Sequence, residues 1–247
     1  MSRKKVLVWM REYLGACLIF LLCLGFCFHA MRGVDISAKL FLPVGTTERK
    51  IKPTVVLDAG HGGEDCGAVG VSGVYEKDIN LIIANCLFEH FLSEGYHVVM
   101  TRTEDHLLYD PDTVKTGHKK STDLANRVKI ANSFDNALFI SIHMNSYPSP
   151  AVEGLQVWYG REDGGEELAT TIQGYVKAHL QEENHRKPKA SGGNMYLLDM
   201  AECPSVLIEC GFLTSVSECA KLCDENYQKE LSFVLFCAII EYITQTT

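Results

Sequence analysis

Four residues far apart in the chain could together carry out hydrolysis at a metal ion: His61, Glu76, His143 and Glu209. A catalytic zinc ion takes three protein ligands, commonly His with Glu or Asp, and leaves a fourth position for water. The ion lowers the pKa of that water to about 7 and polarises a carbonyl group. A separate carboxylate must accept the proton and deliver it to the leaving amine. Two His and one Glu as ligands, with a second Glu as the base, complete this set.

Each of the four residues lies where a regular sequence pattern begins or ends. Apolar runs end at or just before His61, His143 and Glu209, in the segments TVVLDAGHGG, LFISIHMNS and SVLIECGF. Glu76 stands ahead of a helical pattern in the segment GVYEKDINL. The H-E-x-x-H arrangement, which places two ligands on one helix, is absent. The fold must therefore bring the four residues together.

Each residue alone also has an ordinary structural interpretation. A single His at the end of a strand is more often a hydrogen-bonded structural residue than a metal ligand. Glu76 alone fits the first turn of a helix, where the helix dipole favours a negative charge. Glu209 is harder to explain in this way, because a carboxylate that ends an apolar strand is costly unless it is paired or metal-bound. From the residues alone, both interpretations stay open.

Apolar runs and helical patterns alternate from residue 53 onward. The strands that we expect are 54–58, 97–102, 137–143, 154–158, 195–198 and 205–209, and the expected helices are 77–93, 122–132, 165–182 and 226–244. This alternation predicts a single α/β domain whose mostly parallel, twisted sheet is flanked by helices on both faces. Such sheets bind ligands beyond the carboxyl ends of their strands. His61, His143 and Glu209 all fall at such ends, which favours one shared site.

The N-terminal segment 1–31 has the pattern of a membrane anchor. Residues 13–31 are apolar except for His29, and a helix needs about 20 apolar residues to span a bilayer. Four basic residues precede this stretch, so we expect the N-terminus to stay cytoplasmic and the rest to be exported: Arg3, Lys4, Lys5 and Arg11. Large side chains occupy the position where a signal peptide would be cleaved, which favours an uncleaved anchor. A linker, 32–52, then leads to the domain at 53–247.

Charge and cysteine content exclude some functions. The chain has a net charge of −8, and the anchor holds several of its basic residues, so the domain is more acidic still. Nucleic acid binding requires a basic face, so it is not expected for this domain. Seven of the ten cysteines follow the anchor, an odd number that cannot pair fully. Cys86, Cys210 and Cys237 occupy apolar positions, where free Cys acts as a small hydrophobe. Cys219 and Cys223 would share one helix face, which leaves a disulfide or metal role there open.

The motifs, taken together, resemble the zinc-dependent N-acetylmuramoyl-L-alanine amidases of the Amidase_3 type, which are bacterial cell-wall hydrolases. The resemblance covers roughly residues 53–243 and rests on seven segments in the family's order: DAGHGGEDCGAVG, YEKDIN, TRTED, LANRVKIAN, SIHMNS, EGLQVWY and PSVLIECGFLT. It implies that His61, Glu76 and His143 hold one zinc ion and that Glu209 is the catalytic glutamate. Asn145, just past His143, is a candidate contact to the substrate.

The resemblance implies hydrolysis of the amide bond between muramic acid and L-alanine in peptidoglycan. The anchor, the short length and the lack of wall-binding repeats are similar to the sporulation amidases of endospore formers. That subgroup implies removal of stem peptides from spore cortex as the first step toward muramic lactam, outside the cytoplasm and in the space between the two membranes of the developing spore. Ser215 departs from the family, where Asn is expected after GFLT, and we expect only a loop to change.

Some family members carry an added helix that blocks the zinc until a partner removes it. The stretch 159–194 leaves no room for such a helix, so we expect control by export, zinc loading or an activating partner protein. The polar loop 103–121 should border the cleft, with His106 and His118 exposed. Arg102 and Arg127 are expected to serve the structure.

Three alternatives remain beside the sporulation amidase. One is an amidase of general wall turnover. Another is a zinc carboxypeptidase acting on the stem peptide, which would need a basic residue such as Arg102 to hold a terminal carboxylate. The third is a membrane-anchored wall-binding protein with a degenerate site, against which the complete set of four residues argues.

Overall fold

The computed structural model describes residues 51–109, 112 and 118–246, which contain six strands and six helices. Residues 51–247 group into one compact unit. In chain order the elements are β1 (Thr54–Ala59), α3 (Glu76–Ser93), β2 (Val98–Met100), α4 (Lys119–Ala131), β3 (Ala137–Asn145), β4 (Gln156–Tyr159), α5 (Gly165–His179), β5 (Lys189–Ala190), α6 (Tyr196–Met200), β6 (Ser205–Phe212), α7 (Val216–Leu222) and α8 (Glu225–Thr246).

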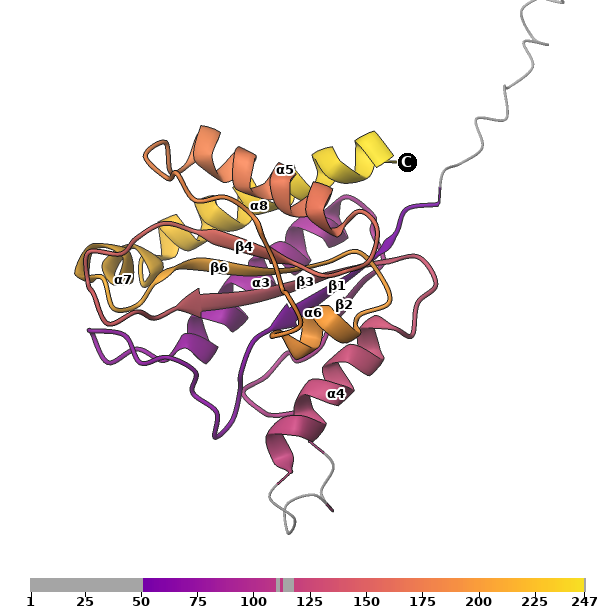
Figure 1. Cartoon of the computed structure of the whole chain (residues 1–247), viewed down its shortest axis with the longest axis horizontal. Coiled ribbons are helices and arrows are strands. Elements are labelled where there is room, and N and C mark those ends of the chain that lie inside the picture. Colours follow the sequence, from indigo (N-terminus) through magenta and orange to yellow (C-terminus); the bar gives the residue numbers. More distant parts are fainter. Residues whose placement is uncertain (1–50, 110–111, 113–117, 247) are drawn as a thin grey trace, which may run out of the picture. The chain divides into compact units, whose positions relative to one another are not determined.

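The strands form one sheet in the order β2-β1-β3-β6-β4-β5 (Figure 1). β2, β1, β3 and β6 run parallel to one another, whereas β4 is antiparallel to β6 and parallel to β5. The sheet is therefore mixed, with the predicted parallel arrangement in the four strands that carry the site. In the parallel register, His143 of β3 stands beside Glu209 of β6.

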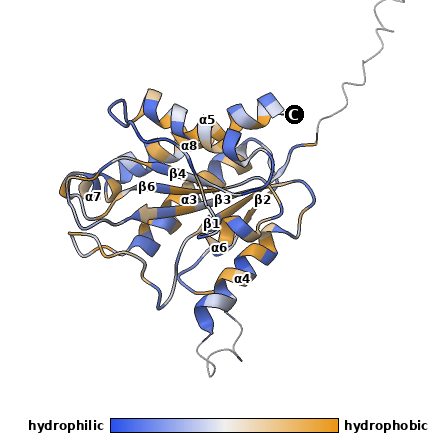
Figure 2. Ribbon diagram, in the orientation of Figure 1, coloured by the Kyte–Doolittle hydropathy of each residue, from blue (hydrophilic) through white to orange (hydrophobic). Residues whose placement is uncertain are grey.

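Helices cover both faces of the sheet because its central strands are apolar on both sides. On one face α3, α5 and α8 enclose the larger core, to which alternate strand residues such as Val55, Leu57 and Ile140 contribute. On the other face α4 and α6 enclose a smaller core around Val56 and Phe139. Hydrophobic colouring lies on the strands and on the helix sides turned toward them (Figure 2). The prediction of helices on both faces is confirmed.

One predicted strand is wrong. Residues 195–198 do not extend, because Tyr196–Met200 forms the short helix α6. The Asp199 carboxylate accepts a hydrogen bond of 3.0 Å from the Met195 backbone N–H, and it thereby satisfies a donor at the start of this turn. The short strand β5 and the helix α7 were not predicted. The other elements appear where the sequence indicates, with ends shifted by a few residues.

Helix α7 explains why the family's Asn can be replaced by Ser215. Ser215 is the N-cap of α7, and its hydroxyl accepts a hydrogen bond from the Glu218 backbone N–H. Ser and Asn are about equally good at this position. Ser215 in place of Asn therefore preserves the start of α7. This agrees with the expectation that the replacement changes only a loop.

The predicted membrane anchor and most of the predicted linker lie outside the described residues. Within residues 51–109, 112 and 118–246, no helix is long and apolar enough to cross a bilayer. The seven cysteines of this part of the chain are all free. Cys210 and Cys219 are buried, Cys86 and Cys237 are half-buried, and Cys223 is exposed.

Candidate metal centre

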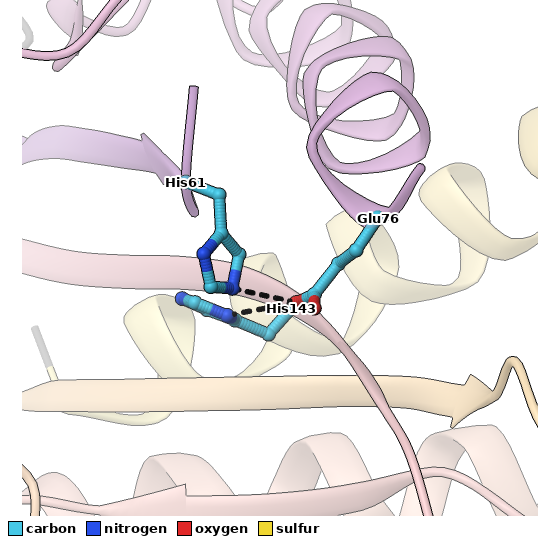
Figure 3. A group of neighbouring side chains, drawn as sticks. All are labelled: His61, Glu76 and His143. Carbon is cyan, nitrogen blue, oxygen red and sulfur yellow. Dashed lines mark hydrogen bonds and ion pairs between the residues drawn. The ribbon is translucent and has the colours of Figure 1, made fainter. Parts of the chain in front are cut away.

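Three of the predicted residues meet at the carboxyl ends of β1 and β3. His61 Nε2 lies 3.2 Å and His143 Nδ1 lies 3.0 Å from the same carboxylate oxygen, Oε1 of Glu76. The two imidazole rings are 5.0 Å apart, edge to face, and both point toward Glu76 (Figure 3). Within the described part of the chain, this is the cluster of His, Cys, Asp and Glu side chains that could hold a metal ion.

His61 reaches the site on a strained turn that two arginines hold. It follows β1 with a φ of 62°, a left-handed conformation that is uncommon for a residue other than glycine. Arg102 donates to the carbonyls of Ala59 and Gly60, at 2.8 and 3.0 Å. Arg127 donates to the carbonyls of Ala59 and His61, at 2.8 and 2.7 Å. Their side chains fix the backbone from which the His61 ring extends.

Arg127 also forms a buried network of charges under the site. Its guanidinium contacts Asp58 at 2.7 Å and Asp123 at 2.9 Å. Burial raises the pKa of Asp58, but Arg127 and the hydroxyls of Ser141 and Thr101 outweigh that effect and hold this pKa below its usual range. Asp58 is therefore ionised, and the network is a structural support in which one guanidinium is shared by two carboxylates.

Glu76 is positioned by the start of α3. As the first residue of that helix, it receives backbone N–H donors on both oxygens, from Met144 to Oε1 at 3.0 Å and from Ala68 to Oε2 at 2.8 Å. Burial alone would raise the pKa of Glu76, but the contacts with His143 and His61 hold it well below its usual range. The carboxylate is thus held ionised, as a metal ligand must be.

Two glycines make the room that the ligands occupy. A Cβ on Gly60 would come within 2.3 Å of the His143 ring. A Cβ on Gly67, which has a φ of 64°, would come within 2.5 Å of Glu76 Oε2 and 2.7 Å of His61. Neither approach is sterically allowed. These contacts account for two of the glycines in the segment after β1.

Glu209 stands beside the cluster and has no partner for one of its oxygens. Its Oε2 is buried without a hydrogen-bond donor, although the neighbouring strand position is His143. Burial raises the pKa of Glu209 to about 7; the charge of Glu76 adds to this effect, and the two histidines oppose it. A carboxyl group with a pKa near neutrality can both accept and donate a proton under working conditions.

The donor set fits a divalent ion with nitrogen and oxygen ligands. Two imidazoles and one ionised carboxylate form a ligand set that zinc accepts. Here both imidazole rings contact the same oxygen of that carboxylate. The second nitrogen of His61, Nδ1, lies 3.0 Å from Asp65. A carboxylate on the far nitrogen fixes the tautomer and orientation of a metal-binding His. Both Glu76 and Asp65 raise the pKa of His61 in the metal-free state, against the effect of burial.

A pocket of about 210 Å³ opens beside the two histidines. Its walls come from the end of β1, the start of α4 and the segment at α6, and include His61, His143, Lys120, Leu124 and Tyr196. A larger groove of about 660 Å³ lies elsewhere, near the ends of α5 and α7, and contains none of the cluster residues. The smaller pocket therefore gives a substrate access to the site.

The remaining predicted residues fall outside the cluster. Asn145 lies at the end of β3, and its side-chain oxygen accepts from the Ser146 N–H at 2.8 Å. It does not line the pocket. His106 and His118 are exposed, as predicted. Arg102 is 2% exposed and donates four hydrogen bonds to backbone carbonyls. It is therefore poorly placed to hold a terminal carboxylate, as the carboxypeptidase alternative would require.

Sequence reasoning missed two residues that touch the ligands. Asp65 lies four residues after His61 and contacts its ring. Asn80 lies one helical turn after Glu76, and its amide donates to Glu76 Oε1 at 3.4 Å and to the Gly60 carbonyl at 3.1 Å. For Asn80 the spacing from Glu76 was an available signal, since residues four apart face the same way on a helix. Asp65 lies with His61 in the loop between β1 and α3, where this spacing gives no such signal.

An α/β domain with a His-Glu-His cluster and an unpartnered carboxylate at the ends of parallel strands has the arrangement of a metallohydrolase. The family model described as N-acetylmuramoyl-L-alanine amidase (Amidase_3) matches residues 55–241. The chain belongs to this family. It is an N-acetylmuramoyl-L-alanine amidase, an enzyme that acts on peptidoglycan.

Comparisons with individual proteins agree with this assignment. The chain is 36% identical over 192 residues to the germination-specific N-acetylmuramoyl-L-alanine amidase of Bacillus subtilis (strain 168), covering 77% of this chain and 80% of the relative. It is similar to the CwlD amidase from Clostridioides difficile, solved in complex with the GerS lipoprotein, with 37% identity, a TM-score of 0.74 and coverage of 78% and 99%. An N-acetylmuramoyl-L-alanine amidase from Clostridium difficile 630 matches at 30% identity and a TM-score of 0.69, with coverage of 79% and 99%. The resemblance expected from the sequence is confirmed.

Proposed function

We propose that the enzyme is zinc-dependent, with one ion held by His61, Glu76 and His143. The observation that supports this most directly is the convergence of both imidazoles on Glu76 Oε1, at 3.2 and 3.0 Å, beside a carboxylate that has no donor. Without an ion, the Glu76 oxygen would serve two rings while the buried Oε2 of Glu209 had no hydrogen-bond donor. Zinc bound there would supply Lewis acidity and lower the pKa of a bound water.

In this proposal Glu209 is the general base and then the general acid. Its Oε2 accepts a proton from the attacking water and passes it to the amide nitrogen of L-alanine as the bond to the lactyl carbonyl breaks. A pKa of about 7 suits both steps, because the group gains and loses a proton with little free-energy change. Asp65 and Asn80 position ligands and take no part in the proton transfer. Asn145 remains a proposed substrate contact.

We further propose that the substrate in the cell is spore cortex. Removal of the stem peptide there would prepare muramic acid for conversion to its lactam. The similarity to a germination-specific amidase and to a CwlD amidase supports this role over general wall turnover. The location of the substrate also supports a catalytic domain outside the cytoplasm, because peptidoglycan lies there. We propose that residues 1–31 anchor this domain to the membrane.

A partner protein is proposed to control the site. The similar CwlD amidase was solved in complex with a lipoprotein, which supports this mode of control. Among the described residues, no fourth His, Cys, Asp or Glu joins the three-residue cluster. In this part of the chain, no fourth side chain of these types occupies the proposed metal site. Control by a second protein is compatible with that geometry.

Digestion of purified peptidoglycan by the full-length chain in mild detergent, with added zinc, tests the proposal. Mass spectrometry of the products should find stem peptides that begin with L-alanine and glycan strands without peptide. Spore cortex and vegetative wall should be digested side by side, and faster release from cortex is expected. Release of free D-alanine instead would overturn the amidase in favour of the carboxypeptidase.

Two variants separate the roles of the residues. Glu209→Gln should keep zinc at one ion per chain and lose turnover by about 100- to 10,000-fold, the usual contribution of a general acid–base residue. His61→Ala should lose both zinc and turnover. Zinc content is measured by elemental mass spectrometry on the same samples. Near-normal turnover by Glu209→Gln would overturn the assignment of the base.

A further inference from the structure

Among the described residues that line the pocket beside the metal centre, Lys120 is a cation exposed to solvent. Most of the pocket's described lining is apolar or belongs to the buried charge network, and the residues that reach solvent include Lys120 and Tyr196. Arg127 also lines the pocket but is 1% exposed and gives its donors to Asp58, Asp123 and two carbonyls. Lys120 has a side chain that is 75% exposed.

Lys120 has little structural reason to be where it is. It stands in the first turn of α4, which contains no acidic residue, and a positive charge there opposes the helix dipole. Its neighbour Lys119 is compensated by close contacts of 2.9 and 3.0 Å with the two carboxylate oxygens of Glu64. Lys120 has only a loose contact of 3.8 Å with Asp65. A lysine so loosely paired at this position can turn its ammonium group toward a ligand.

Its location relates it directly to the reaction. The Asp65 oxygen that Lys120 contacts lies 3.0 Å from His61 Nδ1, so the ammonium group is two contacts away from a proposed metal ligand. In the stem peptide, the residue after L-alanine carries a carboxylate. Because consecutive Cα atoms are about 3.8 Å apart, that carboxylate lies only a few ångströms beyond the bond that is cleaved. The lysine side chain is long and flexible enough to bring its ammonium group to a carboxylate at that distance from the cleaved bond.

We propose that Lys120 is a specificity-determining residue that binds the carboxylate of the acidic residue following L-alanine. The inference rests on the proposed function, since it assumes that the stem peptide extends from the metal centre into this pocket. A stem peptide in which that carboxylate is replaced by an amide loses the ion pair and is bound less well. The enzyme would thereby distinguish amidated from free stems.

The test compares two synthetic substrates, N-acetylmuramoyl-L-alanyl-γ-D-glutamyl-L-lysine and N-acetylmuramoyl-L-alanyl-D-isoglutaminyl-L-lysine, with the zinc-loaded full-length chain. The γ-carboxyl is amide-linked in both, so the two differ only in the α-carboxylate of the glutamate. Wild type should prefer the glutamate substrate. Lys120→Ala should reduce this preference about fivefold, mainly through KM, as expected for a partly exposed ion pair. Lys120→Arg should retain the preference, and Lys120→Glu should reverse it. Lys119→Ala, which removes the neighbouring charge, is the matched control and should keep the preference.

Each other outcome has a distinct meaning. If Lys120→Ala slows both substrates by the same factor, the residue acts through Asp65 and the inference is overturned. Zinc content of every variant, measured on the same samples, detects such an effect on the metal centre separately from turnover. If wild type cleaves both substrates at the same rate, the amidase activity stands and the inference about Lys120 is overturned.

Discussion

The guanidinium of Arg127 donates a hydrogen bond of 2.7 Å from Nη2 to the backbone carbonyl of His61. The same His61 has a φ of 62°, a backbone conformation that residues other than glycine rarely adopt. A buried cation on α4 thus holds the strained turn from which a proposed metal ligand extends. Strain of this kind persists only where the surroundings fix it.

Arg127→Lys should therefore destabilise the protein. A lysine cannot provide the planar set of donors that reaches two carboxylates and two carbonyls at once. We expect a loss of about 1–3 kcal/mol in the free energy of unfolding, the cost of a buried acceptor left without its donor. Urea unfolding of the metal-free protein measures it. Lys129→Ala, at an exposed position on the same helix, is the control, and equal stability of the two variants would contradict the support role.

Gly67→Ala should weaken metal binding more than Gly73→Ala. Both glycines have positive φ, at 64° and 84°, so an alanine is strained at either position. Only at Gly67 would the new Cβ collide with Glu76 and His61, whereas nothing lies within 4 Å at Gly73. Zinc affinity, measured by competition with a chromophoric chelator, should fall in the first variant and stay near wild type in the second. Equal affinities would show that the glycine serves only the backbone.

Asp65→Ala should lower zinc affinity without removing a ligand. Asp65 contacts His61 Nδ1 at 3.0 Å and so fixes the ring with Nε2 toward Glu76. Loss of such an orienting group usually reduces metal affinity by about 10- to 100-fold. The same chelator competition measures it, with Asp78→Ala, an exposed acidic residue on α3, as the control for lost negative charge. An unchanged affinity would mean that the turn alone orients the ring.

Glu209 should make the stability of the metal-free protein depend on pH. Burial raises the pKa of Glu209 to about 7 from an ordinary value of 4.5, so the folded state binds this proton more tightly than the unfolded state. The resulting stabilisation is complete below about pH 4.5 and is lost as the pH rises through about 7. Glu209→Gln lacks this titration. Its stability relative to wild type should therefore increase between pH 5 and pH 8, by up to about 3 kcal/mol at about 1.4 kcal/mol per pKa unit.

Urea unfolding in the presence of a chelator, at several pH values for both proteins, provides the measurement. A difference between wild type and Glu209→Gln that stays constant from pH 5 to pH 8 would show that Glu209 has an ordinary pKa in the folded state. The assignment of Glu209 as a group that both accepts and donates protons near neutrality would then lose its physical basis.

The positions of the proposed ligands could be predicted from the sequence because each stands at the border of a regular pattern. His143 and Glu209 close apolar strands, and in a parallel sheet such ends meet at one edge. The structure places these two residues side by side in the register of β3 and β6. Local pattern and topology were sufficient here, since neither depends on the details of side-chain packing.

The sequence indicates that Arg102 and Arg127 serve the structure, and this is confirmed, but the groups that they hold could not be predicted in the same way. Arg102 donates to backbone carbonyls, and Arg127 donates to two carbonyls as well as to Asp58 and Asp123. A carbonyl has no signature in the sequence because every residue carries one. The segment at 195–198 was mistaken for a strand because a short apolar run does not distinguish a strand from one helical turn. Its helical form depends on the Asp199 carboxylate, which receives the Met195 N–H.

The two outer strands of the sheet have a consequence for how the protein behaves at high concentration. β2 has three residues and β5 has two, and both residues of β5, Lys189 and Ala190, are exposed. An unpaired strand edge can template another chain, and short edges that carry lysine resist this. The long, apolar strands that form the site lie inside the sheet, with both edges already paired. The shortness of both outer strands, and Lys189 on β5, therefore disfavour edge-to-edge pairing with another chain.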